Sequence, residues 1–252
     1  MNHLEDHHVV ISGGGTGVGA ATASAFAQAG ASVTILGRTQ ARLDEIAGLN
    51  GAFAVSCDVT DLDALDEAMN KARAENGPIS IAIANAGMAT STPFARMTKL
   101  DLSTMLEVNL VGVFNLWQAC LPDLKSRARG RLIAIASTAG LKGYPYVSGY
   151  CAAKHGVIGL TRSVALELAP SSITANAICP GFVDTPLLDR SVENIVAKTG
   201  LSAMEARENL VQNNPQGRFI ETDEVAATAL WLASHGARSV NGQAISVNGG
   251  EV

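Results

Sequence analysis

Several features that mark other classes of protein are missing from this sequence, and each absence narrows its possible functions. The formal net charge is −5 and there is no run of lysine and arginine, so neither nucleic acid nor an anionic membrane is an expected partner. No apolar run is long enough to cross a bilayer. The first residues hold no basic region followed by an apolar block, so no signal peptide is expected.

Cysteine is also sparse, and its few positions are far apart: Cys57, Cys120, Cys151 and Cys179. They form no C-x-x-C pair, which argues against structural disulfides and zinc and favours a cytoplasmic, reducing location. His3, His7 and His8 stand close together near the start. We interpret these histidines as part of a polar segment that leads into the first strand, and we predict no metal site.

The residues that are present follow the alternation of a layered fold. Apolar residues make up 47% and charged residues 16%, which is enough for a folded core. Short apolar runs predict strands over residues 7–12, 31–36, 51–56, 79–84, 131–137, 172–178 and 243–247. Helical patterns lie between them, over residues 17–29, 39–48, 61–76, 101–127, 149–168 and 223–234. Asp61 and Thr222 are expected to cap the helices that follow them.

Most of these strands are continuously apolar, as in a parallel sheet covered on both faces. The sequence therefore predicts a single α/β domain over residues 1–252, a Rossmann-like, doubly wound parallel sheet of about seven strands with helices on both faces. Residues 181–215 break the alternation and are too long for a turn. We expect this insertion to be partly helical and to cover a ligand as a lid.

A glycine-rich loop joins the first strand to the first helix. Two registers fit: G-x-x-x-G-x-G at Gly13, Gly17 and Gly19, or the looser G-x-G-x-x-A at Gly15, Gly17 and Ala20. Glycine lets the backbone approach a pyrophosphate, and the helix N-terminus offers free N–H groups. A tight turn without a ligand is the alternative. The loop residues expected at a cofactor are Ser12, Gly13, Gly15, Thr16, Gly17, Val18 and Gly19.

The end of the second strand indicates which dinucleotide binds. A residue that binds the ribose 2′-hydroxyl would be Asp or Glu, but this chain has Gly37, followed by Arg38 and Thr39. Glycine leaves room for a 2′-phosphate and a guanidinium can hold it in a fork, so NADP(H) is expected rather than NAD(H). The alternative is an exposed arginine that starts a helix.

Two further strand ends supply candidate cofactor contacts. Asp58 and Val59 follow the third strand, where an adenine amino group would be met, although turn chemistry explains Asp58 equally well. Asn85, Ala86 and Gly87 form a small turn after the fourth strand, which would pass close under a cofactor ribose.

A serine, a tyrosine and a lysine form the candidate catalytic group. Ser137 ends a strand, where side chains face the ligand crevice of such a sheet. Tyr150 and Lys154 are four residues apart and share one helix face. The lysine is expected to lower the phenol pKa from about 10, so that the phenol exchanges a proton with a carbonyl or an alcohol. Ser137 would hold the same oxygen. Asn109 lies in an apolar helical run and needs a partner, expected to be backbone or water near Lys154; the alternative is a packing defect.

With these residues the chain resembles the short-chain dehydrogenase/reductase family over nearly its whole length. The family's T-G-x-x-x-G-x-G is matched with serine for threonine, and its N-N-A-G is matched by Ala84-Asn85-Ala86-Gly87 without the first asparagine. The resemblance assigns the family's catalytic tetrad to Asn109, Ser137, Tyr150 and Lys154.

The resemblance also implies what surrounds this tetrad. The turn of Pro180 and Gly181 would frame the nicotinamide, with Val183 and Thr185 as amide and phosphate contacts. The implied reaction is hydride transfer between a nicotinamide and a carbonyl or alcohol. The implied assembly is a homotetramer or a dimer, in which the fourth and fifth predicted helices pack across an interface.

Within the family, the C-terminal part is similar to reductases of β-ketoacyl thioesters. The 3-hydroxybutyrate dehydrogenases share this layout, but they bind a free carboxylate at positions that here hold Ala139, Val147 and Ala89. A 3-oxoacyl thioester of CoA or acyl carrier protein is therefore expected, although Lys142 is placed to reach an anion. The expected apolar wall is Leu187, Leu188, Tyr144, Tyr146 and Met88. The alternatives are an NAD-linked alcohol, sugar or steroid dehydrogenase and a non-catalytic dinucleotide sensor.

Overall fold

A seven-stranded sheet forms the centre of the molecule in the computed structural model, which describes residues 4–127 and 129–252. Its strands run in the order β3-β2-β1-β4-β5-β6-β7, and all neighbours are parallel. They are β1 (His8–Ser12), β2 (Ser32–Gly37), β3 (Phe53–Ser56), β4 (Ile81–Ala84), β5 (Gly130–Ile135), β6 (Ile173–Pro180) and β7 (Ala244–Val247). The prediction of a doubly wound parallel sheet is confirmed. The order reverses between β1 and β4, where such folds bind ligands.

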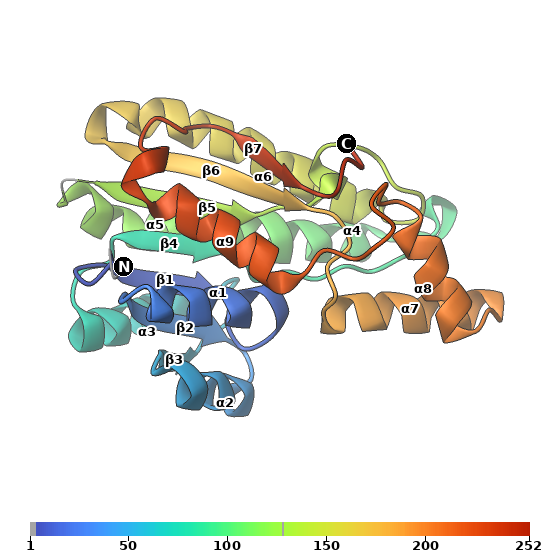
Figure 1. The fold of residues 1–252 in the computed structure, drawn as a ribbon, viewed down its shortest axis with the longest axis horizontal. Helices are drawn as coiled ribbons and strands as arrows, with labels where there is room; N and C mark the ends of the chain where they lie inside the picture. The colour runs from blue at the N-terminus through green and yellow to red at the C-terminus, as the bar shows by residue number, and fades with distance from the viewer. Residues whose placement is uncertain (1–3, 128) are drawn as a thin grey trace.

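Helices cover both faces of this sheet (Figure 1). They are α1 (Gly17–Gln28), α2 (Gln40–Asn50), α3 (Leu62–Asn76), α4 (Lys99–Leu106), α5 (Gly112–Lys125), α6 (Ser148–Leu168), α7 (Pro186–Thr199), α8 (Ala203–Val211) and α9 (Thr222–Ala233). One core lies between the sheet and α3, α5 and α6, and the other between the sheet and α1, α2 and α9. Val10 belongs to the first core and Val9 and Ile11 to the second, because successive strand residues face opposite sides.

One local expectation is wrong and another needs a refinement. The stretch 101–127 is helical almost throughout, but a π-helical turn (Glu107–Val111) lies between α4 and α5. Thr222 is the first residue of α9 rather than its cap. Glu221 takes the cap position, and its N–H donates to the Glu224 carboxylate. The expected cap of α3 is confirmed, since the Asp61 carboxylate accepts from an N–H in the first turn.

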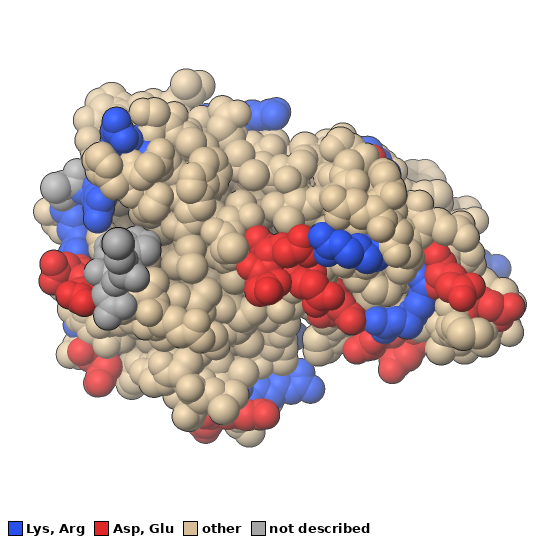
Figure 2. Space-filling view, in the orientation of Figure 1, with Lys and Arg blue, Asp and Glu red and all other residues tan. Residues whose placement is uncertain are grey.

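The insertion at 181–215 contains α7 and α8, which extend from one end of the sheet (Figure 1). The two helices share a small apolar cluster built on Leu188, Val192 and Ala206. Figure 2 shows acidic side chains lying beside basic ones over this region, with no broad basic patch on that face. Within the described residues, no helix is both long and apolar enough to cross a membrane.

Candidate active site

A cavity of about 510 Å³ opens at the carboxyl ends of the strands, between the glycine loop and α7. The tertiary structure brings many of the sequence-predicted residues to this one space. Those that line it are Gly13, Thr16, Gly17, Val18, Asn85, Ala86, Gly87, Asn109, Ser137, Tyr150, Lys154, Pro180, Gly181, Val183 and Thr185. Those that lie outside its lining are Ser12, Gly15, Gly19, Gly37, Arg38, Thr39, Asp58 and Val59.

The glycine loop has a conformation that requires glycine at several positions. Gly13 and Gly17 adopt φ of +66° and +53°, in the left-handed region. A Cβ on Gly19 would lie 2.1 Å from the Gly13 carbonyl oxygen. These constraints favour the G-x-x-x-G-x-G register. The N-terminus of α1 has no side-chain cap at Thr16, and its first residues line the cavity, so its uncapped N–H groups fit the diphosphate of a dinucleotide.

Ser12 and Asn85 hold the glycine loop against the turn after β4. The Ser12 hydroxyl accepts from the Asn85 N–H at 3.0 Å and from the Ala86 N–H at 3.1 Å. The Asn85 amide donates in return to the carbonyl oxygens of Ser12 and Gly13, both at 3.0 Å. Ser12 is buried under the loop rather than at the cavity, so its contribution is to the shape of the loop.

An arginine that the sequence analysis did not single out lies at the cavity instead of Arg38. Arg38 is exposed beside Asp58, with its guanidinium 4.0 Å from that carboxylate. Arg42, on α2, lines the cavity. Its side chain begins close to the glycine loop, since a Cβ added to Gly15 would lie 3.4 Å from the Arg42 Cβ. The spacing of four residues from Arg38 was the one available signal, since it places both cations near the start of α2.

Ser137, Tyr150 and Lys154 meet where β5 ends beside α6. Ser137 precedes a short 3₁₀ turn (Thr138–Gly140), and its hydroxyl accepts from an N–H of that turn. Lys154 is 3% exposed, and its ammonium donates to the Ile135 carbonyl at 2.8 Å. The same Nζ lies 5.6 Å from the centre of the Tyr150 ring. The predicted pairing of phenol and amine on one helix face is therefore present at the cavity.

The protonation states of this pair differ from the expectation. Burial raises the pKa of Tyr150 to about 12, against a smaller lowering by the Ser137 side chain. Burial lowers the pKa of Lys154 to about 8. In the chain alone the phenol pKa is raised rather than lowered, because desolvation of Tyr150 is the largest cause of its shift. The phenol keeps its proton at neutral pH, which is the form that can donate to a carbonyl.

Asn109 lies in the π-helical turn and has no exposed surface. Its Oδ1 accepts from the Met88 N–H at 3.1 Å, and its Nδ2 donates to the carbonyls of Met88 and Met105 at 2.9 and 3.0 Å. A Cβ on Gly87 would lie 2.9 Å from Asn109 Oδ1 and 3.8 Å from Lys154 Nζ. Asn109 therefore fixes the turn after β4 close to the lysine. Single π turns inside helices often occur at functional sites.

The substrate side of the cavity matches the sequence analysis in part. Of the positions considered there, the lining includes Met88, Ala89, Leu187 and Leu188 but not Ala139, Tyr144, Tyr146, Val147 or Lys142. Lys142 is paired with a carboxylate, that of Glu251, at 3.1 Å. Lining residues that the sequence did not indicate are Ile135, Ala136, Phe182, Pro186, Asp189, Arg190, Ser191 and Glu193. Most lie on or beside α7, and the pattern of α7 does not show which of its sides faces a cavity.

Comparison with known proteins agrees with this geometry. The family model described as "Enoyl-(Acyl carrier protein) reductase" matches residues 13–251. The chain is 35% identical to 3-oxoacyl-[acyl-carrier-protein] reductase FabG of Thermotoga maritima and 34% identical to D-beta-hydroxybutyrate dehydrogenase of Cupriavidus necator, with 99% of each chain covered in both cases. The crystal structure of a variant of actinorhodin polyketide ketoreductase with NADPH superimposes with a TM-score of 0.95, at 29% identity, over 100% of this chain and 99% of that one.

The chain therefore belongs to the short-chain dehydrogenase/reductase family, and it is an oxidoreductase with a nicotinamide dinucleotide as its cofactor.

Proposed function

We propose that this protein is an NADP(H)-dependent reductase of 3-oxoacyl thioesters, carried on CoA or acyl carrier protein. The observation that carries the proposal is that Ser137, Tyr150 and Lys154 line the same cavity as the turn of Pro180 and Gly181. The names of the reductase and ketoreductase relatives support the substrate class. A sensor without catalysis is disfavoured because the phenol and the amine both border the cavity.

Different residues around the cavity would bind the cofactor and transfer the proton. Gly13, Gly17 and the first turn of α1 would hold the diphosphate, and the Pro180-Gly181 turn would support the nicotinamide, which supplies a hydride when bound. The Tyr150 phenol donates its proton to the carbonyl oxygen as that oxygen gains negative charge. The Ser137 hydroxyl donates a hydrogen bond to the same oxygen.

The preference for NADP(H) rests on the end of β2. Gly37 leaves the position of an acidic residue without a side chain, and two cations, Arg38 and Arg42, follow it. Arg38 is 73% exposed with only a long pair to Asp58, and Arg42 lines the cavity, so both side chains are candidates to bind a 2′-phosphate beside Gly37. Replacing Arg38 by glutamate should shift the preference toward NADH. An unchanged ratio of NADPH to NADH affinity would remove Arg38 from the phosphate site.

Thioesters are favoured over free keto acids because the positions of a carboxylate anchor are apolar. Ala89 borders the cavity, Ala139 is buried, and Lys142 is occupied by its ion pair. The D-beta-hydroxybutyrate dehydrogenase relative makes acetoacetate the second substrate to test.

The direct test is the fall of NADPH absorbance when acetoacetyl-CoA is added, compared with acetoacetate, cyclic ketones, sugars and steroids, each with NADPH and with NADH. We expect acetoacetyl-CoA with NADPH to be fastest. Tight NADPH binding with no turnover of any ketone would favour the sensor, whereas faster turnover of acetoacetate would favour a keto acid as the substrate.

We propose further that the protein works in the cytoplasm as a homotetramer. Large apolar side chains are exposed on two long helices, Phe114 on α5 at 46% and Leu166 on α6 at 81%. Both side chains lie on the helices that the family resemblance places at a subunit interface. Light scattering should give the mass of four chains; the mass of one chain would contradict the assembly.

A further inference from the structure

We propose that Glu251 is a positioning residue of the active site, whose buried carboxylate fixes two segments of the cavity wall from behind. The kinetic readout of this inference rests on the proposed substrate, whereas its binding readout rests only on the nicotinamide lying at the turn of Pro180 and Gly181. Glu251 does not line the cavity. Its side chain is 1% exposed, although it stands next to the last residue of the chain.

The carboxylate joins the end of the chain to the segment between β5 and α6. Its Oε1 accepts from the Tyr144 phenol and pairs with the Lys142 ammonium at 3.1 Å. The Tyr144 oxygen also lies 2.6 Å from the Thr138 hydroxyl. A phenol has one proton to give, and a carboxylate can only accept, so Thr138 must be the donor in that second bond. One carboxylate thus organises three side chains that follow the strand end of Ser137.

The last residues reach this position through a turn that only small residues allow. Gly249 and Gly250 adopt φ of +65° and +93°, and a Cβ on Gly249 would lie 1.9 Å from Asn214 Oδ1. The Asn248 side chain accepts from the N–H groups of Gly250 and Glu251 at 3.1 and 3.2 Å. Asn214 and Asn248 therefore fix the backbone before Glu251, and the Glu251 side chain is directed into the protein.

Three routes connect Glu251 to the cavity wall. Its second oxygen, Oε2, packs against Gly181, where an added Cβ would lie 3.1 Å from it. The Tyr144 ring meets Phe182 edge to face, with the ring centres 6.2 Å apart. Thr138, hydrogen-bonded to Tyr144, directly follows Ser137. Gly181, Phe182 and Ser137 all line the cavity, so a shift of the carboxylate moves the wall at three places.

The Glu251 carboxylate has few partners, so the side chains that it holds should respond to its removal. Oε2 has no hydrogen-bond partner among the described residues, and the one cation beside Glu251 is Lys142, whose side chain is 35% exposed. Deleting the carboxylate would remove the charged acceptor of the half-buried Tyr144 phenol and leave Thr138 as its remaining partner in this group. The ring would then be free to move against Phe182, and misplacements of about 1 Å can lower a rate about a hundredfold.

The test compares two truncations that differ by one residue. Deletion of Val252 alone keeps Glu251 and should leave the rate of acetoacetyl-CoA reduction unchanged. Deletion of residues 251–252 should lower kcat by about tenfold to a hundredfold. Glu251→Gln keeps an acceptor for Tyr144 and should recover most of the loss, as a purely structural shortening of the chain would not. Thermal unfolding of each variant shows whether it is folded.

A binding measurement separates this inference from the proposed function. Glu251 supports the nicotinamide end, so the 251–252 deletion should weaken NADPH, followed by its nicotinamide fluorescence, while ADP-ribose, which lacks nicotinamide, keeps its affinity. Equal weakening of both ligands, or none, would overturn the positioning role even if the wild-type protein reduced no ketone. If Glu251→Gln lost as much kcat as the 251–252 deletion, hydrogen bonding to Tyr144 would not be the means of positioning.

Discussion

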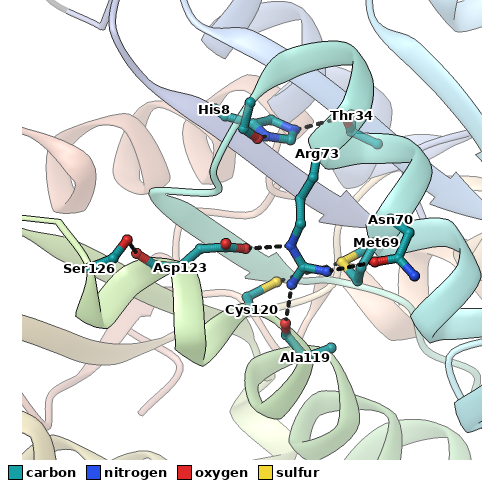
Figure 3. A network of polar contacts seen from close by, with 10 residues as sticks. His8, Thr34, Met69, Asn70, Arg73, Ala119, Cys120, Asp123 and Ser126 are labelled. Carbon is teal, nitrogen blue, oxygen red and sulfur yellow. Dashed lines mark hydrogen bonds and ion pairs between the residues drawn. The ribbon is translucent and has the colours of Figure 1, made fainter.

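Near the amino ends of the strands, a network around His8 and Arg73 is hydrogen-bonded within the fold, whereas polar side chains at the carboxyl ends border an open cavity. At the amino ends, His8 is 2% exposed, and its two ring nitrogens lie 2.7 Å from the Gly77 carbonyl and 2.9 Å from the Thr34 hydroxyl. Close by, Arg73 of α3 pairs with Asp123 of α5 at 2.9 Å (Figure 3). Each group in this network has its partner inside the fold.

At the carboxyl ends, the titratable groups have few partners within the chain. Lys154 makes one hydrogen bond, to a backbone carbonyl, and burial shifts its pKa and that of Tyr150 in opposite directions. A buried polar group with hydrogen-bond partners stabilises the fold, whereas a buried titratable group that borders a cavity has a shifted pKa and can react with a ligand. We therefore expect the amino ends of the strands to serve stability and the carboxyl ends to serve catalysis. Substitutions at the amino ends should change the free energy of unfolding, and those at the carboxyl ends should change the rate.

The largest expected effect is on the rate at the carboxyl end. Tyr150→Phe removes the proton donor, and kcat for carbonyl reduction should fall about 10²- to 10⁴-fold. The affinity for NADPH and the unfolding temperature should stay nearly unchanged. Tyr146→Phe is the matched control, because that phenol is exposed and outside the cavity. Full activity in Tyr150→Phe would contradict the acid role.

The opposite result is expected at the amino end. Asp123→Ala leaves Arg73 without its partly buried partner and should lower the free energy of unfolding by about 1–3 kcal/mol, measured by urea denaturation. The rate of reduction should not change. Arg218→Ala breaks a more exposed pair with Glu224 and should cost less than about 1 kcal/mol. A large loss of activity in Asp123→Ala would show that the two ends are coupled.

The rate of reduction should also depend on pH through Lys154. Its ammonium loses a proton as the pH rises past about 8, whereas Tyr150, with a pKa raised to about 12, stays protonated. A charged Lys154 favours the phenolate that Tyr150 becomes as it gives up its proton, so the rate should fall about tenfold for each pH unit above that value. Lys154→Arg keeps its charge and should remove this decline from the kcat profile. A flat wild-type profile between pH 8 and pH 10 would contradict this assignment.

The smallest expected effect is on stability at acid pH. Burial lowers the pKa of His8 from 6.5 in the folded protein, so the unfolded chain takes up a proton first. The contribution of neutral His8 is present above that value and is lost as the pH falls below it, by at most about 1.4 kcal/mol per pH unit. Unfolding of wild type and His8→Gln at pH 7.5 and pH 5.5 measures the difference. An equal slope in both proteins would remove His8 as its source.

The sequence alone predicts much of this difference between the two ends of the sheet. Continuous apolar runs such as Val9 to Ile11 indicate buried parallel strands, and the carboxyl end of each strand then identifies the side of the site. The glycine loop is local in sequence, so its conformation at Gly13 and Gly17 follows from residue type. The spacing of Tyr150 and Lys154 gives their shared helix face without any tertiary contact.

Other features have no local signal. Arg42 and the inner side of α7 reach the cavity because of how helices pack over the sheet edge. The π turn at Asn109 interrupts a pattern that is typical of a single helix. The pKa of Tyr150 is raised mainly by burial, which the spacing of Tyr150 and Lys154 does not reveal.

Periodicity and the residues at strand ends are enough to establish the fold, the glycine loop and the serine, tyrosine and lysine of the site. Only the folded arrangement settles which charges face the cavity, which protonation states they hold, and that Glu251 folds back behind Gly181. Those properties depend on distances between residues far apart in the chain, and desolvation and contact are set by those distances.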